Sequence, residues 1–346
     1  MIQIKKLVLI ILVFSVSAMN LLASGQNRAG TAAAPELRIP VGARYLAMGG
    51  AQISSVNGLE SIYWNPSGLP YTDSYANAIF SYRSYIADMN VDYVALSGRM
   101  VGLGTIGLSF RSLNIGSIDV TTLDQPDGTG AIMKPTFFVI GLTYAKRLTD
   151  RISVGATFNI ISENFDRASA TGSSFDIGVQ YRELFDVTGL SFGVVVKNLG
   201  GSMTYGGNAL VKTADDPDGQ RGPTFYNFDP SSADLPSEFS LGLSYTHHLS
   251  EKNDLTVAFA FQNNNFSYDN YKIGGEYSYD NIFFLRAGYI FSPQATADAP
   301  NIFENYTLGA GLNLKNLTDM NLSIDFSYVP VKYFSNNNVF SIRYGF

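Results

Sequence analysis

Histidine and cysteine most often carry catalysis or metal binding, and this chain has few of either. It contains two histidines, the neighbours His247 and His248, and no cysteine. Neighbouring residues of a strand point to opposite faces, so the two imidazoles cannot hold one metal ion together. No acidic residue is placed by sequence to orient either ring as a base. Without cysteine, neither a disulfide framework nor a thiolate site can form. We expect no enzyme, no metal site and no cofactor.

Two other motifs could bind small ions, and both are incomplete. The segment 215–219, DDPDG, offers carboxylates for calcium but lacks the spacing and terminal Glu of an EF-hand loop, so a solvated acidic loop is expected. Gly49 and Gly50 lack the lysine and the strand–loop–helix setting of a phosphate-binding loop. The formal net charge of −6 at pH 7 gives no reason to expect a nucleic acid partner.

The N-terminal 25 residues have the pattern of a secretory signal peptide. Lys5 and Lys6 precede an apolar run, 7–22, and Ala23-Ser24-Gly25 supplies small residues before a cleavage site at Gln26. A retained membrane helix fits less well, because polar residues interrupt the run and no stop-transfer charges follow. We therefore expect residues 1–25 to be removed on export. No cysteine follows them, which excludes a lipoprotein anchor.

The composition of the remaining chain favours a membrane protein made of strands. Charged residues make up 15% of the sequence, below the ~25% of ordinary soluble domains. The chain contains 24 Phe, 21 Tyr and 33 Gly. After the signal peptide no apolar run approaches the ~20 residues that a membrane helix needs. A closed β-barrel is the other structure that satisfies every backbone polar group within a membrane.

Alternation of apolar and polar residues with a period of two predicts the strands of this barrel. In the segment 152–160, for example, Ile, Val, Ala, Phe and Ile alternate with Ser, Gly, Thr and Asn. The predicted strands are 75–83, 91–100, 104–112, 135–147, 151–162, 172–182, 188–198, 236–248, 253–263, 269–279, 282–291, 304–314, 319–329 and 337–346. The fold class is thus all-β, a 14-stranded antiparallel transmembrane β-barrel over 75–346, preceded by a small N-terminal hatch or plug over 26–74.

The connections alternate in length, which indicates how the barrel lies in the membrane. Connections after even strands are short, whereas most after odd strands are longer, above all 113–134 and 199–235. Short periplasmic turns and long extracellular loops are typical of bacterial outer-membrane barrels. The chain ends in Tyr344-Gly345-Phe346, a final strand with a terminal aromatic residue. It resembles the C-terminal signal for the barrel-assembly machinery, and outer-membrane lipids would surround the apolar wall.

Assigning the apolar faces to lipid leaves polar side chains in the lumen. An Arg or Lys facing lipid at mid-depth would cost ~2–4 kcal/mol. The residues expected to point inward are Arg111, Asp176, Gln180, Arg182, Lys197, Lys272, Glu276, Arg286, Asp325 and Arg343. The long loop 199–235 carries Tyr205, Phe225, Tyr226 and Phe228. Because exposed aromatic residues favour contact over disorder, we expect this loop, with 113–134, to cap the lumen or to dock a protein partner.

The segment before the barrel contains two notable motifs. Gln26–Pro35 is small and polar and is expected to be mobile, and Val41–Met48 is expected to form a short helix stopped by Gly49-Gly50. The stretch 61–69, SIYWNPSGL, holds the only tryptophan. Asn65-Pro66 favours a turn and Gly68 permits a tight one. The simplest outcome is a hatch anchored in the barrel by Trp64.

These motifs resemble a known N-terminal signature. The stretches VGARYLAMGGAQIS, 41–54, and LESIYWNPSGLP, 59–70, are similar to the start of PorV/PorQ family outer-membrane proteins and, more distantly, of FadL, the fatty-acid channel. Ser67 stands where Ala is common. The resemblance implies a plugged 14-stranded barrel. Its hatch residues would be Arg44, Met48, Gly49, Gly50, Trp64, Asn65, Pro66 and Gly68.

The resemblance leaves two functions open. PorV-like proteins serve type IX secretion by carrying or receiving exported proteins, so the partners would be a secretion translocon and secreted proteins. FadL-like proteins passively transport long-chain fatty acids or other hydrophobic molecules through an opening in the wall, so the partner would be a hydrophobic ligand. We favour the secretion role. Whether the SIYWNPSGL turn gates the lumen or only seats the hatch stays open.

Overall fold

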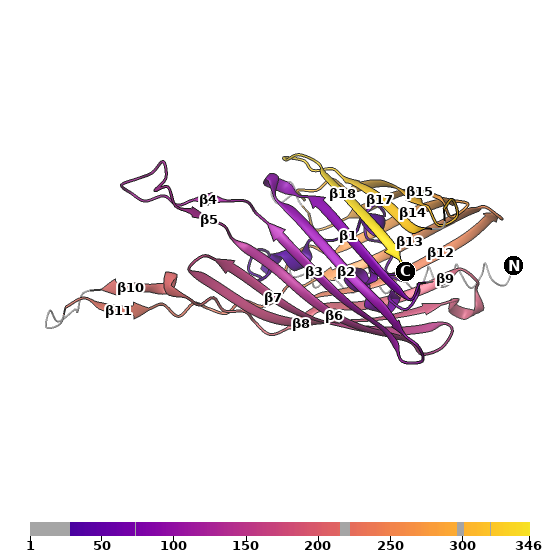
Figure 1. Ribbon diagram of the computed structural model, residues 1–346, viewed down its shortest axis with the longest axis horizontal. Helices are drawn as coiled ribbons and strands as arrows, with labels where there is room; N and C mark the ends of the chain where they lie inside the picture. The colour runs from indigo at the N-terminus through magenta and orange to yellow at the C-terminus, as the bar shows by residue number, and fades with distance from the viewer. Residues whose placement is uncertain (1–27, 73, 215–221, 296–300, 319) are drawn as a thin grey trace.

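The computed structural model describes residues 28–72, 74–214, 222–295, 301–318 and 320–346. Within these residues fourteen antiparallel strands close into one barrel, in which β1 and β18 meet (Figure 1). The barrel strands are β1 (Ala76–Ser84), β2 (Asn90–Met100), β3 (Gly104–Asn114), β6 (Thr136–Arg147), β7 (Ile152–Phe165), β8 (Ala168–Arg182), β9 (Leu190–Gly200), β12 (Glu238–Ser250), β13 (Asn253–Asn264), β14 (Asn270–Tyr279), β15 (Phe283–Phe291), β16 (Tyr306–Asn313), β17 (Asn321–Val329) and β18 (Asn337–Gly345). The predicted fold class is confirmed.

The alternation that predicted the strands separates an apolar outer face from a polar lumen. On β3, Ile106, Leu108 and Phe110 are exposed on the outside, whereas Ser109 and Arg111 between and beyond them are buried inside. Period-two burial of this kind recurs along the other strands. No helix among the described residues is long and apolar enough to cross a membrane.

The long predicted connections contain regular structure that the sequence did not indicate. The connection 113–134 contains a hairpin of β4 (Ile118–Asp119) and β5 (Ile132–Met133), and 199–235 contains a hairpin of β10 (Val211–Ala214) and β11 (Thr224–Asn227). Both hairpins project from the same end of the barrel, which we call the outer mouth (Figure 1). The opposite end, where β1 begins and β18 ends, is the inner mouth.

One predicted loop, 163–171, is wrong. Strands β7 and β8 continue through it and pair as far as Phe165 and Ala168, with a tight turn at Asp166, whose φ is +56°. The alternation weakens in this stretch of small and polar residues, yet cross-strand pairing extends the hairpin. The segments 1–25 and 215–219, for which a signal peptide and an acidic loop are predicted, lie outside the described residues.

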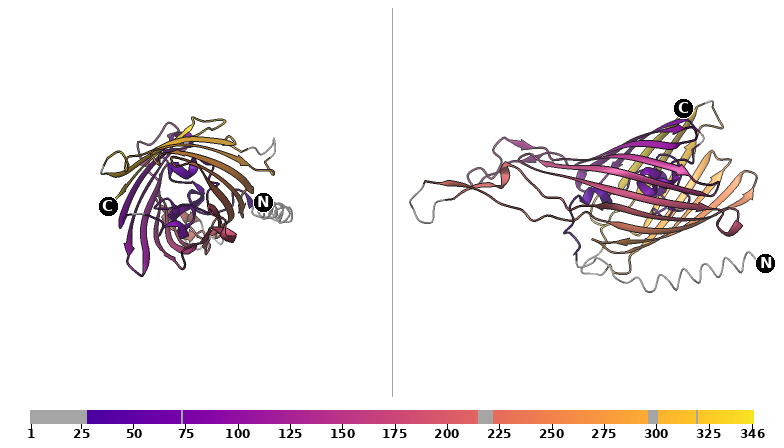
Figure 2. Two further views of the ribbon diagram at one scale, coloured as in Figure 1. Left: turned by 90° about the vertical axis from the view of Figure 1, so that its right-hand side faces the viewer. Right: turned by 90° about the horizontal axis from the view of Figure 1, so that it is seen from below.

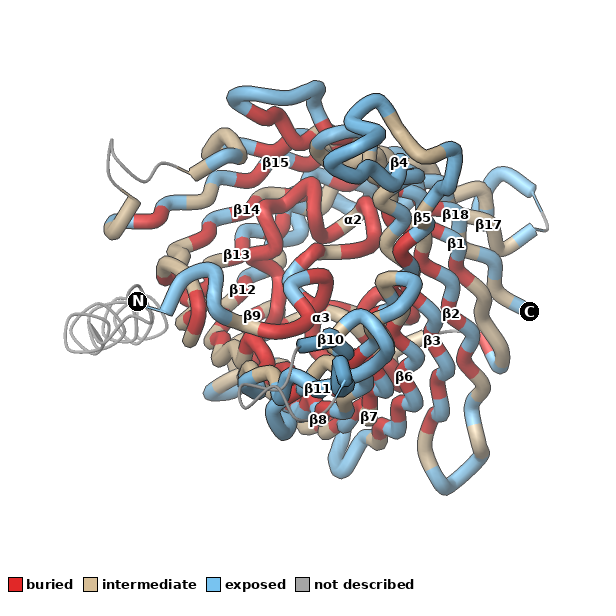
Figure 3. Tube along the Cα trace, turned by 90° about the vertical axis from the view of Figure 1, so that its left-hand side faces the viewer, coloured by how far each residue is buried: buried red, intermediate tan, exposed pale blue. Residues whose placement is uncertain are grey.

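The segment 28–72 lies inside the barrel and is the hatch. Figures 2 and 3 show it within the ring of strands, largely buried. It contains four short helical turns, which are η2 (Pro35–Arg38), α2 (Ala43–Leu46), α3 (Ser61–Trp64) and η3 (Pro66–Gly68). The predicted helix is thus a single turn, followed by Gly49 and Gly50 at positive φ. Between these turns the backbone is irregular and must find hydrogen-bond partners outside itself.

The wall has glycine at the places where the hatch backbone comes closest. A Cβ atom added there would collide with hatch residues 47–54 or 65–67 or, at Gly242, make an unusually tight contact with Ile53. We call these glycines the glycine belt: Gly155, Gly178, Gly193, Gly242, Gly274, Gly288 and Gly309. They lie on seven different strands, so the hatch approaches the wall around most of the lumen.

Adding a methyl group to the glycine belt should disturb the hatch. In Gly155→Ala the new Cβ would meet the backbone of Pro66 and Ser67, which cannot rotate away. We expect a loss of ~1–3 kcal/mol in the free energy of unfolding, as for other overpacked cores. Denaturant unfolding in detergent micelles measures it. Gly98→Ala is the matched control, because no atom lies within 4 Å of its added Cβ. Equal effects of the two variants would contradict close packing at the belt.

Candidate functional site

The two hatch motifs pack directly on each other. The Trp64 ring lies over Gly50, whose φ is +68°, where any side chain would collide with it. Trp64 Nε1 donates a hydrogen bond to the carbonyl of Val41 at 3.1 Å. Glu60 lies against Gly42 in the same way. The glycines and the large residues of the two motifs are therefore complementary in shape, which explains why the motifs occur together.

The Asn65-Pro66 turn fixes the hatch to the wall. Asn65 is fully buried, and its amide donates to the carbonyl of Ile53 at 3.0 Å. It also reaches the strand carbonyls of Val179 and Val194, both at 3.4 Å. The Asn65 side-chain oxygen accepts a hydrogen bond from Ser67 Oγ at 2.6 Å. One side chain thus closes the turn and joins it to β8 and β9.

Inward-pointing wall side chains satisfy the irregular hatch backbone. Arg83 donates to the carbonyl of Pro40 at 2.8 Å, and Thr307 donates to that of Ala47 at 2.9 Å. The further donors are Arg111 to the carbonyls of Leu37 and Ile39, Gln180 to those of Ile53 and Val56, and Arg182 to that of Val56. These residues stabilise the plug, since a buried carbonyl without a donor is costly.

A buried ion network joins the hatch to the far wall. Arg44 of the hatch donates two hydrogen bonds to the Glu276 carboxylate, at 3.1 and 3.2 Å. Arg286 bonds Glu276 at 2.5 Å and Asp325 at 2.7 Å. Arg343 lies 2.9 Å from Asp325. Four of the residues expected in the lumen thus meet one hatch residue in a continuous chain of charges.

Glu60 completes the network from the hatch side. Its carboxylate lies 3.9 Å from Arg343 and accepts a hydrogen bond from the backbone of Arg44 at 3.3 Å. Burial raises the pKa of Glu60, and the positive charge of Arg343 opposes that rise. With three arginines facing three carboxyl groups, the network has little net charge. Sequence reasoning missed Glu60, although it stands directly before the SIYWNPSGL motif.

The other lumen residues expected from the sequence lie apart from this network. Asp176 accepts hydrogen bonds from the Asn159 side chain at 2.9 Å and from the Asn198 backbone at 2.7 Å. Arg182 stacks on Tyr71, 3.3 Å from the ring centre, toward the inner mouth. Lys272 lines a separate cavity on the outer side of the hatch.

A second carboxyl cluster lies near the outer mouth, and no sequence pattern predicted it. Glu36 of η2 is 3% exposed, and neither of its carboxyl oxygens finds a hydrogen-bond partner. Burial raises its pKa to about 8, and the neighbouring carboxylate of Glu163 adds to the rise, while Arg111 opposes it. Tyr205 donates a hydrogen bond to Glu163. The base of the long loop therefore contacts the hatch through buried carboxyl groups.

This cluster corrects two expectations. Tyr205 is half-buried between Met203, Ala233 and the hatch, so it is not an exposed loop aromatic like Phe225, Tyr226 and Phe228. The described part of Gln26–Pro35 is not mobile throughout either. Ala33 and Ala34 are buried, and Ala33 donates a backbone hydrogen bond to Asp234 at 3.0 Å. Apolar contact with the base of the loop orders a segment whose composition suggested none.

The structure also gives one histidine an acidic partner. His248 Nδ1 lies 2.5 Å from Asp254 Oδ1, across the turn from β12 to β13, so the expectation that no acid orients either ring is wrong for His248. The side chain is 70% exposed and lies outside the lumen cavities. No group of three or more metal-ligating side chains occurs among the described residues. At the chain end, Tyr344 and Phe346 are exposed and pack edge to face at 4.6 Å.

The hatch divides the lumen. The outer cavity has a volume of about 220 Å³, and two cavities on the inner side have volumes of about 240 and 750 Å³. Trp64 and Leu46 line the outer cavity, whereas Arg44 lines both inner ones. Among the described residues, none lines both the outer cavity and either of these inner cavities.

Comparisons with known proteins agree with the motif and the fold. The family model of type IX secretion system protein PorV matches residues 22–190, which confirms the resemblance inferred from the sequence. No curated protein matches the sequence. The matched family model is that of a secretion protein, and the solved structures below share the barrel fold.

Three solved structures illustrate the fold. The CymD monoaromatic hydrocarbon channel has a TM-score of 0.56 and 15% identity, covering 88% of this chain and 97% of its own. The Pseudomonas putida toluene transporter TodX gives 0.53 and 12%, covering 86% and 95%. A Pseudomonas aeruginosa FadL homologue gives 0.53 and 14%, covering 89% and 99%. At these identities the likeness establishes the fold alone.

Breaking the ion network should loosen the hatch. Glu276→Gln leaves Arg44 and Arg286 facing a neutral amide, and removing one partner from a buried pair typically costs ~3–5 kcal/mol. Denaturant unfolding should show this loss, and bilayer recordings should show new ion conductance. Asp280→Asn, which breaks an exposed pair with Lys252, is the control and should change neither. An unchanged Glu276→Gln protein would show that the network does not hold the plug.

Glu36 should make stability depend on pH. The unfolded chain ionises this group near pH 4.5, whereas the folded protein keeps it protonated up to about pH 8. Its contribution to stability is therefore full below pH 4.5 and is lost as the pH rises to about 8, by up to roughly 1.4 kcal/mol per pH unit. Glu36→Gln should remove this dependence in unfolding experiments across the range. The exposed Glu251→Gln should keep it, and identical pH profiles of all three proteins would refute the assignment.

Proposed function

We propose that this barrel, which resembles the PorV family over residues 22–190, is a closed protein-binding component of type IX secretion. The observation that carries this proposal is the divided lumen. Buried ion pairs, an asparagine anchor and close glycine contacts hold the hatch between the outer and inner cavities. A component that presents or receives proteins needs an anchored barrel with a docking surface, not an open pore.

The outer hairpins supply the docking surface in this proposal. Phe225 is 75% exposed and Phe228 is 62% exposed on the hairpin β10–β11, and Leu123 is fully exposed in the loop between β4 and β5. Large apolar side chains exposed on projecting arms are typical of surfaces that bind another protein. Both arms leave the barrel at the outer mouth (Figure 1). We infer that protein partners bind there.

Passive transport of hydrophobic molecules is the second candidate. It is favoured by the fold shared with hydrocarbon channels and by the apolar side of the outer cavity, where Leu46, Trp64 and Phe303 lie. Such transport needs an exit past the hatch or through the wall. The register shifts between β8 and β9 at Phe175/Ile177, but Asp176 accepts the free backbone N–H of Asn198 at 2.7 Å and closes the irregularity. This contact argues against a gap there.

Gentle purification from the native outer membrane tests the two functions. Mass spectrometry should find secretion components or secreted proteins bound to the barrel. Recovery of the barrel alone, with fatty acids or other hydrophobic molecules in its lumen, would favour transport and contradict our proposal. We also propose that the chain is exported and cleaved before Gln26. The barrel-assembly machinery would then recognise the last strand, which ends in Tyr344 and Phe346.

Removing the aromatic arm should block partner binding without unfolding the barrel. Replacing Phe225, Tyr226 and Phe228 with Ser removes exposed apolar area from β11 and the residue that follows it. Met203 and Tyr205 at the base of the loop stay intact. We expect co-purification of partners and surface delivery of secreted proteins to fall at least about tenfold, the loss of ~1.4 kcal/mol or more of binding free energy.

The matched control replaces Lys212, Thr213 and Thr224 of the same hairpin with Ser and should behave as the unchanged protein. The heat-dependent gel mobility of folded barrels checks that both variants assemble. Normal secretion by the aromatic-free variant would show that partners bind elsewhere.

A further inference from the structure

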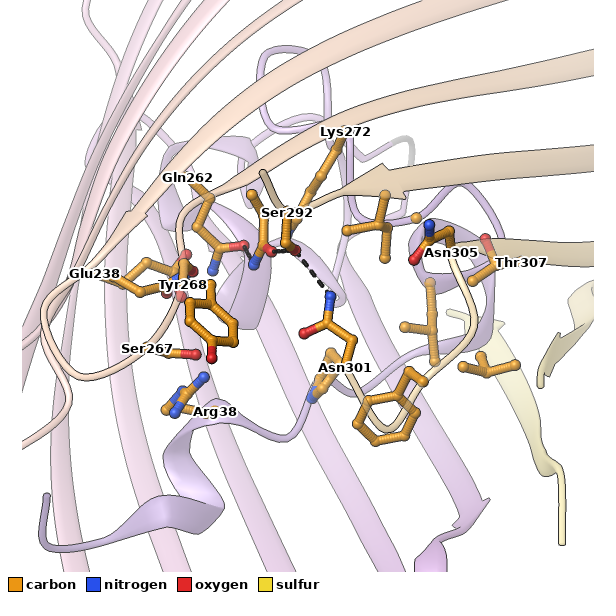
Figure 4. A pocket seen from close by; sticks show the side chains of 18 of the residues that line it. Arg38, Glu238, Gln262, Ser267, Tyr268, Lys272, Ser292, Asn301, Asn305 and Thr307 are labelled. Carbon is orange, nitrogen blue, oxygen red and sulfur yellow. Dashed lines mark hydrogen bonds between the residues drawn. The ribbon is translucent and has the colours of Figure 1, made fainter. Parts of the chain in front are cut away.

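The outer cavity combines apolar side chains with an unusual number of polar ones for a site that would take hydrocarbons alone. It lies between the hatch and the outer turns of β12 to β16, and its volume is about 220 Å³ (Figure 4). Hydroxyl and amide side chains make up much of its lining: Gln262, Asn264, Ser267, Asn270, Ser292, Asn301, Asn305 and Thr307. A hydrocarbon chain placed here would strip water from these groups without replacing their hydrogen bonds.

The cavity also carries unbalanced positive charge. Lys272 is 8% exposed and lines the cavity, yet it forms no ion pair or hydrogen bond within the described part of the chain. Glu238 is the carboxylate that acts electrostatically on Lys272, and it is shared with Lys197, from which it lies 3.8 Å away. Arg83 donates its hydrogen bond to the carbonyl of Pro40 and has no carboxylate partner among the described residues. The charged lining residues are four cations, Arg38, Arg83, Lys197 and Lys272, and two carboxylates, Glu238 and Glu304. Because an excess of buried positive charge is costly, the site favours an anion.

Hydrogen bonds hold several of the polar lining side chains in place. Asn270 bonds Gln262 at 3.4 Å, Ser292 donates to Asn270 at 2.5 Å, and Asn301 donates to Ser292 at 3.1 Å. This chain of hydrogen bonds runs from β13 to the start of β14, then to the residue after β15 and to the segment before β16 (Figure 4). It fixes amide and hydroxyl groups that can both donate and accept, as the hydroxyl groups of a sugar require.

Aromatic rings also line the cavity. Tyr63 and Trp64 of the hatch pack edge to face at 5.2 Å, and Tyr85 packs with Phe303 at 6.0 Å. All four line the cavity. Packed aromatic rings together with a small set of fixed polar groups are the usual lining of a small-molecule site.

We propose that the outer cavity binds a small anionic carbohydrate, with its carboxylate or phosphate group at Lys272, its hydroxyl groups on the amide and hydroxyl side chains and its ring against the aromatic side chains. The site goes beyond the proposed secretion role and does not depend on it. The anionic group could be either acid, since Lys272 provides a point charge that suits both.

Trp64 provides a direct readout, because it is the only tryptophan of the chain and lines the cavity. The purified barrel in nanodiscs of zwitterionic lipid would be titrated with glucuronate, glucose 6-phosphate, glucose and laurate. We expect saturable changes in Trp64 emission with glucuronate, with glucose 6-phosphate or with both, at concentrations at least tenfold below those needed for glucose. Which acid binds identifies the anionic group.

Lys272→Gln should weaken binding of the acids at least tenfold and leave the glucose response unchanged. Lys212→Gln, on the exposed hairpin, is the matched control and should bind as the unchanged protein does. If Lys272→Gln fails to assemble, the comparison of the acids with glucose on the unchanged protein still tests whether the site prefers an anion. No response to either acid, equal binding of glucose, or binding of laurate alone would overturn the proposal.

Discussion

An irregular backbone buried inside a barrel must find a partner for each of its polar groups, and this requirement organises the lumen. The hatch has only single turns of helix, so most of its carbonyls have no intrasegment donor. Arg83, Arg111 and Gln180 supply donors from the wall. Several charged residues of the lumen thus act as structural caps on the hatch, which is a different role from lining a water-filled pore.

Close approach makes this capping possible. Each glycine of the belt has no side chain, so the hatch backbone lies directly against seven strands of the wall. At this distance a short donor such as Thr307 reaches a hatch carbonyl. The same closeness brings Arg44 within reach of Glu276. Each such contact excludes water from the others, so the anchors support one another. A hatch held in this way would move as a unit, if it moves.

The sequence predicted the barrel well because a period of two reports the two faces of a strand. It identified lumen residues such as Glu276 and Asp325 but not their partners, since those depend on register and on the path of the hatch. Arg44 and Glu276 are 232 residues apart. The Glu36–Glu163 contact joins a single glutamate in an apolar stretch to the end of a strand, and no local pattern marks such a pair. The outer hairpins were missed because their strands are short and exposed on both faces.

The hatch and the long loop are physically joined, and this connection bears on function. Arg28 pairs with Asp234 at 2.7 Å, Ala33 bonds the same residue, and Glu36 faces Glu163 beside Tyr205. The loop that bears the exposed aromatic residues therefore rests on the first residues of the plug. A partner that pulls on the loop would strain these contacts before it reached the ion network around Arg44. The contacts at the outer mouth are few and partly exposed, whereas the inner ion network is buried. Binding at the outer mouth would therefore displace the start of the hatch while the lumen stayed closed.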